Sequence, residues 1–128
     1  MRLLLDTHIL LWFAAGHPRL KPAWRSALED QGNEILVSTV SLWEAAIKVR
    51  IGKLAADIPA LTAGCVRAGF RIVELSPRHL ARLMRLSPPG DHRDPFDHLL
   101  LAQAAAEDAR FVTAEPRLGQ YGVSILAG

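Results

Sequence analysis

The chain has 128 residues, of which 50% are hydrophobic and 22% charged, with 15 Lys and Arg side chains against 13 Asp and Glu. This length predicts one domain over residues 1–128, and the high apolar content excludes an intrinsically disordered chain. The single cysteine, Cys65, excludes an internal disulfide framework and a cysteine-based zinc site, and it is compatible with a reducing, cytoplasmic location.

The N-terminal segment is apolar on either side of a polar interruption. Arg2 to Leu5 and Ile9 to Ala15 flank the sequence Asp-Thr-His at positions 6–8. A secretory signal is rarely split by a charge, and a membrane-spanning helix needs about 20 apolar residues. We therefore expect a buried strand that leads through a polar turn into a helix, and no association with a membrane.

The rest of the chain alternates helices with short apolar strands. The predicted helices cover Lys21 to Gln31, Ser41 to Ile51, Ala60 to Ala68, a segment from Pro77 onward, and Pro95 to Glu107. The predicted strands cover Glu34 to Ser38, Arg71 to Leu75, Arg110 to Thr113, and Val123 to Leu126. Together they predict a three-layer α/β/α domain around a parallel sheet of about four to five strands.

Acidic residues lie near the carboxyl ends of the predicted strands, where open α/β sheets bind ligands. They occur in four separate segments, at Asp6, at Glu44, at Asp94 with Asp97, and at Glu115. Clustered carboxylates raise one another's pKa unless a cation neutralises them. A site made only of oxygen ligands suits Mg²⁺ or Mn²⁺ and not zinc.

Local structure offers a second explanation for most of these acids. The local explanations are a capping box between Ser41 and Glu44, an N-cap and a first-turn acid at Asp94 and Asp97, and a turn before Pro116 at Glu115. Asp6 gains little from local structure, because it joins an apolar strand to an apolar helix. Both explanations stay open for each of the other acids, while the coincidence of four segments favours a shared metal site.

Three motifs carry a resemblance to a known family. They are Leu4-Leu5-Asp6-Thr7-His8, Ser41-Leu42-Trp43-Glu44-Ala45-Ala46-Ile47-Lys48, and His92-Arg93-Asp94-Pro95-Phe96-Asp97-His98-Leu99-Leu100-Leu101-Ala102-Gln103-Ala104. In order and spacing they resemble the PIN-domain ribonucleases, and most closely the VapC-like toxins of bacterial toxin–antitoxin modules. The resemblance implies an endoribonuclease that acts on single-stranded or looped RNA and depends on Mg²⁺, with Mn²⁺ able to substitute. It also implies an RNA substrate, a homodimer and a small cognate antitoxin protein.

The resemblance also assigns roles to the acids. Asp6, Glu44 and Asp97 match the three acidic site residues of the family, and Asp94 is expected beside the metal ligands. Glu115 occupies a position where aspartate is usual, which makes a strict two-metal mechanism less secure. The implied chemistry is attack on the RNA phosphodiester by a metal-activated water, which leaves a 5′-phosphate and a 3′-hydroxyl. The hydroxyls of Thr7 and Thr113 could support the metal ligands.

Basic residues are candidates for phosphate contacts. Arg78, Arg82 and Arg85 recur at helical spacing on the face opposite Leu80, Leu83 and Met84, which we expect to be buried. Lys48 and Arg93 are further candidates. Such a stripe grips phosphates, although a solvated helix face explains it equally well. Trp12, Phe13 and Trp43 are expected in the core or in contacts with a second copy or the antitoxin, rather than as platforms for stacking bases.

Two other classes of function remain open. A haloacid-dehalogenase-type phosphotransferase also ends its first strand in an aspartate, but it needs a second aspartate at the position of His8. The other alternative is a catalytically impaired PIN-like module that binds RNA or protein and has lost activity through Glu115. Stabilisation by Mn²⁺ separates an active nuclease from such a module, because a bound ion stabilises the folded state.

Overall fold

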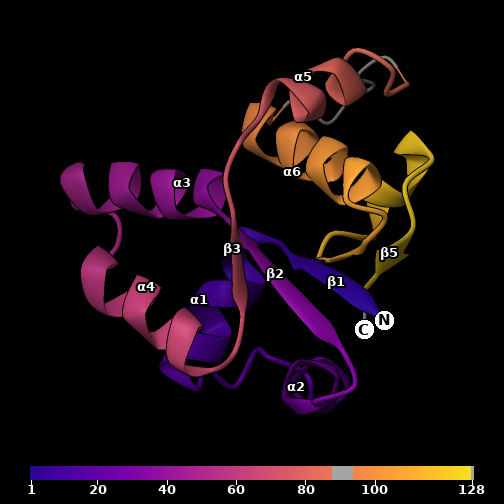
Figure 1. The fold of residues 1–128 in the computed structure, drawn as a ribbon. Helices are drawn as coiled ribbons and strands as arrows, with labels where there is room; N and C mark the ends of the chain where they lie inside the picture. The colour runs from indigo at the N-terminus through magenta and orange to yellow at the C-terminus, as the bar shows by residue number, and fades with distance from the viewer. Residues whose placement is uncertain (88–93, 128) are drawn as a thin grey trace.

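The computed structural model describes residues 1–87 and 94–127. Its elements in chain order are β1 (Arg2–Leu5), α1 (Thr7–Ala15), α2 (Pro22–Glu29), β2 (Glu34–Ser38), α3 (Thr39–Arg50), α4 (Ile58–Arg67), β3 (Arg71–Val73), α5 (Pro77–Leu83), α6 (Pro95–Ala106), β4 (Arg110–Val112), the 3₁₀ helix η1 (Pro116–Tyr121), and β5 (Ile125–Leu126). The five strands form one parallel sheet in the order β3-β2-β1-β4-β5 (Figure 1). The predicted fold class is confirmed.

Alternate side chains of the strands enter two separate cores. Leu3 and Leu5 of β1 pack in one core with α1 and α2, whereas Leu4 packs in the other core with α6. Successive side chains of a strand point to opposite faces, so a sheet covered on both faces needs an unbroken apolar strand. In Figure 1, α1, α2 and α4 lie below the sheet, and α6 lies on the other side with α5 packed against it.

The N-terminal segment forms β1 and α1, as its pattern predicts. The two elements are joined directly at Asp6, which is the N-cap of α1. Among the residues that the structure describes, no helix has both the length and the apolar character needed to cross a membrane.

Helix α3 begins two residues earlier than the sequence predicts. Its N-cap is Ser38, whose hydroxyl accepts a hydrogen bond from the Val40 N–H at 2.9 Å. Ser41 and Glu44 therefore lie inside the helix, and both are buried. The predicted capping box between them is wrong, because β2 runs directly into the helix and its last residue supplies the cap.

Helix α5 does not bury the face that the sequence predicts. Leu80 and Met84 are 46% and 83% exposed, whereas His79 is only 1% exposed. His79 Nδ1 accepts the Ser76 N–H at 3.0 Å, so Nε2 carries the proton and donates to Glu107 Oε2 at 2.9 Å. These hydrogen bonds turn His79 toward α6 and leave the two apolar side chains in solvent.

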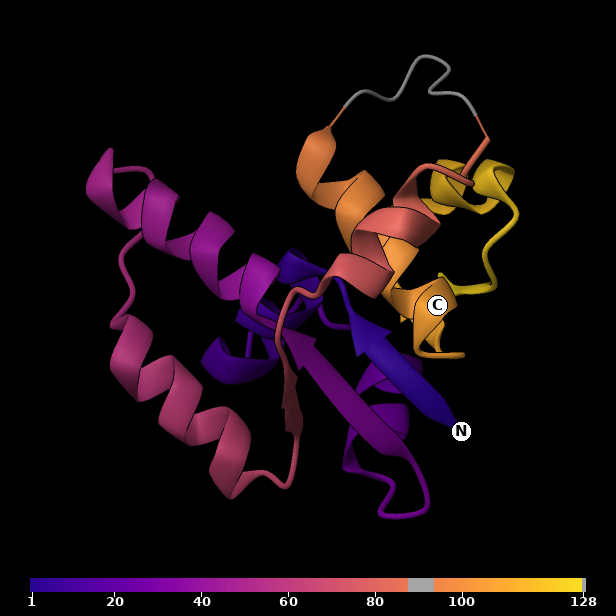
Figure 2. The same ribbon diagram turned by 45° about the horizontal axis from the view of Figure 1, so that its top comes forward.

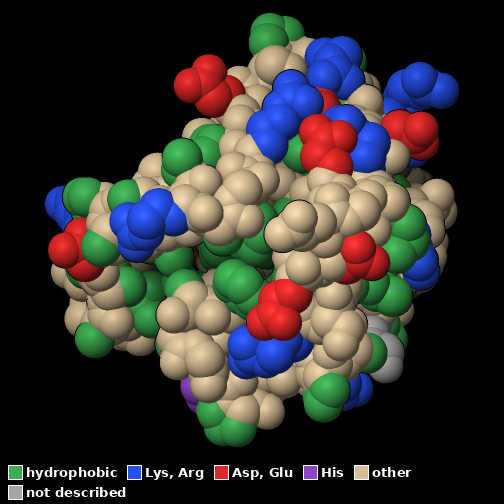
Figure 3. Space-filling view, turned by 60° about the horizontal axis from the view of Figure 1, so that its bottom comes forward, with side chains coloured by type: hydrophobic (Ala, Val, Ile, Leu, Met, Phe, Trp, Pro, Cys, Tyr) green, Lys and Arg blue, Asp and Glu red, His purple; other side chains and the backbone are tan. Residues whose placement is uncertain are grey.

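The face formed by α1 and α4 carries an apolar hollow. Its volume is about 510 Å³, and its lining includes Leu10, Phe13, Leu61, Cys65 and Phe70. Figure 3 shows hydrophobic side chains gathered on the left of this side of the molecule. An apolar surface of this kind is typical of a site that binds another protein.

Candidate active site

The carboxyl ends of β1 and β4 lie side by side and hold Asp6 in place. Leu5 pairs with Val112, and the Asp6 N–H donates to the Val112 carbonyl at 2.9 Å. Asp6 Oδ1 accepts the Thr7 N–H at 2.7 Å, and Oδ2 accepts the Thr113 hydroxyl at 2.7 Å. Thr113, which lies 107 positions after Asp6, therefore helps to fix the buried Asp6 carboxylate in a single orientation.

The carboxyl group of Asp6 is 6% exposed, and its environment disfavours the charge. Burial raises the pKa of Asp6 above its ordinary value, and the nearby Glu44 carboxylate adds to this rise. The hydrogen bonds from Thr113 and Thr7 and the charge of His8 offset part of the increase in pKa. A bound cation would relieve the remaining cost of the charge.

Glu44 joins this carboxylate through Thr7. The Thr7 hydroxyl donates to Glu44 Oε1 at 2.7 Å and lies 3.1 Å from the Ser41 hydroxyl, while the Thr7 N–H binds Asp6. Lys48, one turn further along α3, places its Nζ 3.1 Å from Glu44 Oε2. One threonine thus bridges two buried carboxylates that come from different segments of the chain.

Asp94 and Asp97 lie at the start of α6. Asp94 Oδ1 accepts the Phe96 N–H at 2.9 Å, so its predicted N-cap role is confirmed. Asp97 lies in the first turn and is half-buried. The Phe96 ring contacts the Trp43 ring of α3 with centroids 5.1 Å apart, which links the start of α6 to the helix that carries Glu44. Figure 2 shows α3 starting at the tips of β1 and β2.

Glu115 is the N-cap of η1 and has a basic partner. Its Oε1 accepts the Arg117 N–H at 3.1 Å, and the Arg117 guanidinium reaches both carboxylate oxygens at 2.9 and 3.1 Å. The Glu115 N–H donates to the Thr113 hydroxyl at 3.0 Å. Thr113 therefore connects the backbone at Glu115 to the carboxylate of Asp6, while the Glu115 carboxylate is paired with a cation from its own turn.

The donor set fits a hard divalent cation. Within residues 1–87 and 94–127, no group of three or more Asp, Glu, His or Cys side chains is placed to hold a metal ion. Mg²⁺ keeps several of its waters and commonly binds through one or two carboxylates together with phosphate oxygens of a substrate. Asp6 and Glu44 are the predicted carboxylates of this kind, although Glu44 Oε2 is already paired with Lys48. Asp97 and Glu115 remain predicted ligands, and Asp94 remains a predicted neighbour of the metal.

The predicted basic contacts differ in their surroundings. Arg78 donates to the Ala106 carbonyl at 2.6 Å and pairs with Glu107, which also pairs with Arg2 at the beginning of β1. Arg78 therefore lies toward the amino-terminal edge of the sheet, away from Asp6. With Arg82 and Arg85 it lines a hollow of about 400 Å³ against the end of α6. Lys48 is paired with Glu44, and Arg93 lies outside the described residues.

Sequence reasoning missed a buried polar network behind the sheet. The Ser38 hydroxyl donates to Gln103 Oε1, and Gln103 Nε2 lies 3.3 Å from His79 Nδ1. His79 leads on to Glu107, and the side chains of Ser38 and Gln103 are fully buried. Gln103 carried the signal for this network, because a single amide within the apolar run Leu99 to Ala106 needs a buried hydrogen-bond partner.

Comparisons with known proteins extend over nearly the whole chain. Residues 3–123 match the PIN domain family. The chain is 31% identical over 119 residues to Ribonuclease VapC22 of Mycobacterium tuberculosis (strain ATCC 25618 / H37Rv), covering 92% of this chain and 90% of that protein.

Two solved structures share the fold at lower identity. VapBC2 from Rickettsia felis, bound to a DNA fragment from its promoter, matches with a TM-score of 0.72 at 19% identity and covers 98% of this chain and 97% of that chain. VapBC-1 from nontypeable Haemophilus influenzae matches with a TM-score of 0.71 at 17% identity over the same shares. The agreement shows that the arrangement of strands and helices is common to all three chains.

Proposed function

The chain belongs to the PIN-domain family, and from that premise we propose that it is a metal-dependent endoribonuclease, the toxin of a toxin–antitoxin module. The observation that carries this proposal is the buried pair of Asp6 and Glu44 at the carboxyl edge of a parallel sheet. The 31% identity to a ribonuclease supports the assignment of RNA as the substrate. We take residues 1–128 as a single PIN domain acting in the cytoplasm.

The proposed site residues act by positioning and by charge. Mg²⁺, or Mn²⁺ in its place, would supply a water of lowered pKa and neutralise charge that builds on the phosphate oxygens. Asp6 would hold the metal, with its carboxylate oriented by Thr7 and Thr113. Glu44 would hold the metal or orient the attacking water by accepting its proton in a hydrogen bond. The expected products carry a 5′-phosphate and a 3′-hydroxyl.

The remaining acids have supporting roles in this proposal. Asp97 is the third metal-holding carboxylate, since the first turn of α6 is linked to α3 through Phe96 and Trp43. Asp94 supports that turn as its N-cap. Glu115 would support a second metal ion only after its carboxylate leaves the Arg117 guanidinium, so we propose that one tightly held metal is sufficient for cleavage.

Basic side chains would bind the phosphates of the RNA. We propose Arg82, Arg85 and Arg93 as contacts, with Lys48 and Arg78 contributing less because Glu44 and Glu107 already pair with them. The exposed guanidinium of Arg85 and the half-buried one of Arg82 border the hollow between α5 and α6. These contacts would make RNA binding strongly dependent on salt concentration.

Two protein partners belong to the proposal. The apolar hollow between α1 and α4 supports binding of a small antitoxin, since it offers a concave apolar surface to a partner segment. The exposed Leu80 and Met84 of α5 support a homodimer, because pairing two copies would remove these side chains from water.

Mapping of RNA ends tests the proposed activity. After induction in cells, the wild-type protein should produce new RNA ends that are absent with Asp6→Asn. Asp57→Asn is the matched control, because Asp57 is an exposed acid that caps α4 and should leave cleavage unchanged. Undiminished cleavage by Asp6→Asn, or by the purified wild type in excess chelator, would contradict the proposal.

A catalytically impaired binding module is the second candidate function. The ion pair between Glu115 and Arg117 favours it, because this pair competes with metal binding at the fourth acidic position. Thermal melting with millimolar Mn²⁺ distinguishes the two candidates. An active nuclease should gain several degrees in Tm through linked binding, whereas the impaired module should show no shift.

A further inference from the structure

Trp43 does not lie in the core, although it follows an apolar pattern in the sequence. Its side chain is 57% exposed, while its neighbours Ser41, Glu44 and Ala45 are buried. The ring is nevertheless held in place, because it meets the Phe96 ring of α6 edge to face at an interplanar angle of 68°. An exposed indole ring that is oriented by a second aromatic ring is a pre-formed apolar surface.

This aromatic pair, Trp43 with Phe96, adjoins the candidate metal ligands. Glu44 follows Trp43 in α3, and Asp97 follows Phe96 in α6. The backbone of Phe96 is fixed by the Asp94 carboxylate at 2.9 Å. Each ring is therefore attached to the same helical turn as one of the proposed site acids, on the two helices that flank the site.

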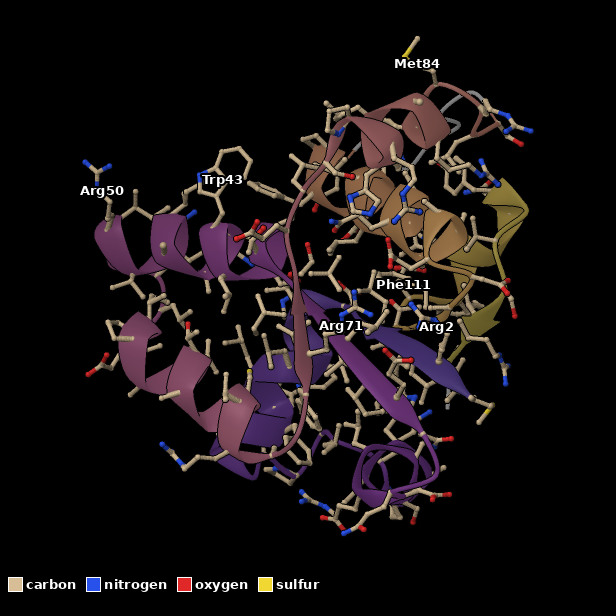
Figure 4. The ribbon with its side chains drawn as sticks, in the orientation of Figure 1. Arg2, Trp43, Arg50, Arg71, Met84 and Phe111 are labelled. Atoms are coloured by element: carbon tan, nitrogen blue, oxygen red, sulfur yellow. The ribbon has the colours of Figure 1, made fainter. Side chains whose placement is uncertain are left out.

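The exposed charge on α3 is positive. Glu44 is its single acid, and that carboxylate is buried and paired with Lys48. Arg50 lies two turns after Trp43, about 10 Å along the helix axis, and makes no ion pair with any residue that the structure describes. Figure 4 shows Trp43 and Arg50 projecting from the same side of α3. An aromatic ring and a free guanidinium on one face are complementary to a base and its phosphate backbone.

We propose that Trp43, supported by Phe96, is a subsite that stacks one unpaired nucleobase of a single-stranded RNA next to the scissile phosphate. The proposal rests on the ribonuclease function proposed above, and it assigns to Trp43 a contact that would account for the single-stranded or looped RNA implied by the family resemblance. Stacking on an aromatic ring needs a base free of its partner strand, and every base has a suitable face. The subsite therefore selects single strands and loops over duplexes, without selecting a particular base.

Binding measurements in a cleavage-deficient background test this subsite. The probe is a short single-stranded RNA of mixed sequence, titrated with Asp6→Asn protein that carries Trp43→Ala, Trp43→Phe or Ile51→Ala. Ile51 is a matched control, since it ends the same helix and is 58% exposed without an aromatic ring. Trp43→Ala should weaken binding about tenfold or more, whereas Trp43→Phe and Ile51→Ala should stay within about threefold.

Cleavage kinetics and duplex binding give independent readouts. With Asp6 intact, Trp43→Ala should raise KM for a single-stranded substrate and leave kcat nearly unchanged. Binding of the same sequence as a duplex should be insensitive to Trp43→Ala. Because the side chain is mostly in solvent, each variant should melt close to its parent protein, which confirms that binding is compared between folded proteins.

The possible failures have different meanings. Equal binding by the Trp43→Ala and Trp43 proteins, in a background that does bind RNA, would overturn the subsite and leave the proposed nuclease intact. A change in solution mass on Trp43→Ala would overturn it in favour of a contact between two copies of the chain. Absence of any RNA binding by Asp6→Asn and wild-type protein would overturn the proposed function together with the subsite.

Discussion

Both carboxylate oxygens of Asp6 accept a hydrogen bond, one from the Thr7 N–H and the other from the Thr113 hydroxyl. These donors replace part of the water that the carboxylate loses on folding, yet burial still raises its pKa. The ionised form of Asp6 is therefore destabilised in the folded protein when no metal is bound. If Asp6 holds the metal as proposed, this local cost is a common trade-off between stability and activity.

Asp6→Asn should therefore stabilise the metal-free protein while abolishing cleavage. Asparagine also serves as an N-cap, and it removes the buried charge. Because the pKa of Asp6 is raised in the folded state, the stability of the wild-type protein falls as pH rises from the unfolded to the folded pKa. The stability gained by Asp6→Asn should therefore be present at neutral pH and smaller in acid. Thermal melting in chelator should show a Tm a few degrees higher. A lower Tm for Asp6→Asn would show that the hydrogen bonds outweigh the cost of the charge.

At the scale of helices, the contact between α5 and α6 depends on a polar network. His79, on α5, donates to Glu107 at the end of α6, and Arg2 and Arg78 add ion pairs to the same carboxylate. The hydrogen bond from His79 is the largest influence on the pKa of Glu107 and lowers it, against the opposing effect of burial. The charged form of Glu107 therefore stabilises the fold.

Glu107→Gln should lower the free energy of unfolding by about 1–2 kcal/mol at neutral pH. Because the folded pKa is depressed, this stabilisation is present above the unfolded pKa and is lost as pH falls through the folded value. Urea unfolding of both proteins at neutral and acidic pH measures the difference. Glu29→Gln, which breaks an exposed pair with Arg25, should change stability by less than about 0.5 kcal/mol. An equal effect of Glu107→Gln at both pH values would contradict this explanation.

The limits of sequence reasoning are also clearest at the scale of elements. The apolar patterns of β1 and β2 predicted both strands with their observed bounds, because a strand buried on two faces is distinctive. The predicted start of α3 was wrong because Ser38 and Ser41 are equally good N-caps locally. Only the end of β2 decides between them. The predicted buried face of α5 was wrong because His79 is held by Glu107. That residue lies 28 positions later and follows the end of α6.

For the site, the sequence predicted the edge of the sheet and the acids but not how they are joined. Asp6 and Glu44 are brought together as predicted, by a threonine that the sequence marked only as a possible support. The pairing of Glu115 with Arg117 was not predicted, because two residues of spacing in a 3₁₀ turn gives no helical periodicity to detect. The exposure of Trp43 depends on how α3 and α6 pack, which no local pattern encodes.

Across the whole molecule, exposed positive charge contrasts with two buried acids. The chain carries 15 basic against 13 acidic side chains, and the two site acids Asp6 and Glu44 are withdrawn from the surface. Arg82 and Arg85 border a hollow beside α6, where a polyanion meets little opposing charge. This distribution favours rapid, electrostatically steered approach of a polyanion such as the proposed RNA substrate.

Arg82→Ala and Arg85→Ala should each reduce the salt dependence of RNA binding. A phosphate contact contributes about one unit to the slope of log affinity against log salt concentration, so each variant should lose roughly one unit. Titrations of labelled RNA at several salt concentrations measure the slope. Arg19→Ala is the control, since Arg19 is exposed on the connection between α1 and α2 and should leave the slope unchanged. Unchanged slopes in both variants would place the RNA elsewhere.

The hydrogen bond from Thr113 to Asp6 ties the first strand of the chain to one of the last. During synthesis β1 is made long before its partner β4, because Thr113 follows Asp6 by 107 positions. A nascent or prematurely ended chain therefore contains the acids in its sequence without the neighbour that orients Asp6. The proposed site is therefore assembled only after residue 113 has been made, and a truncation before that residue should leave the site unassembled.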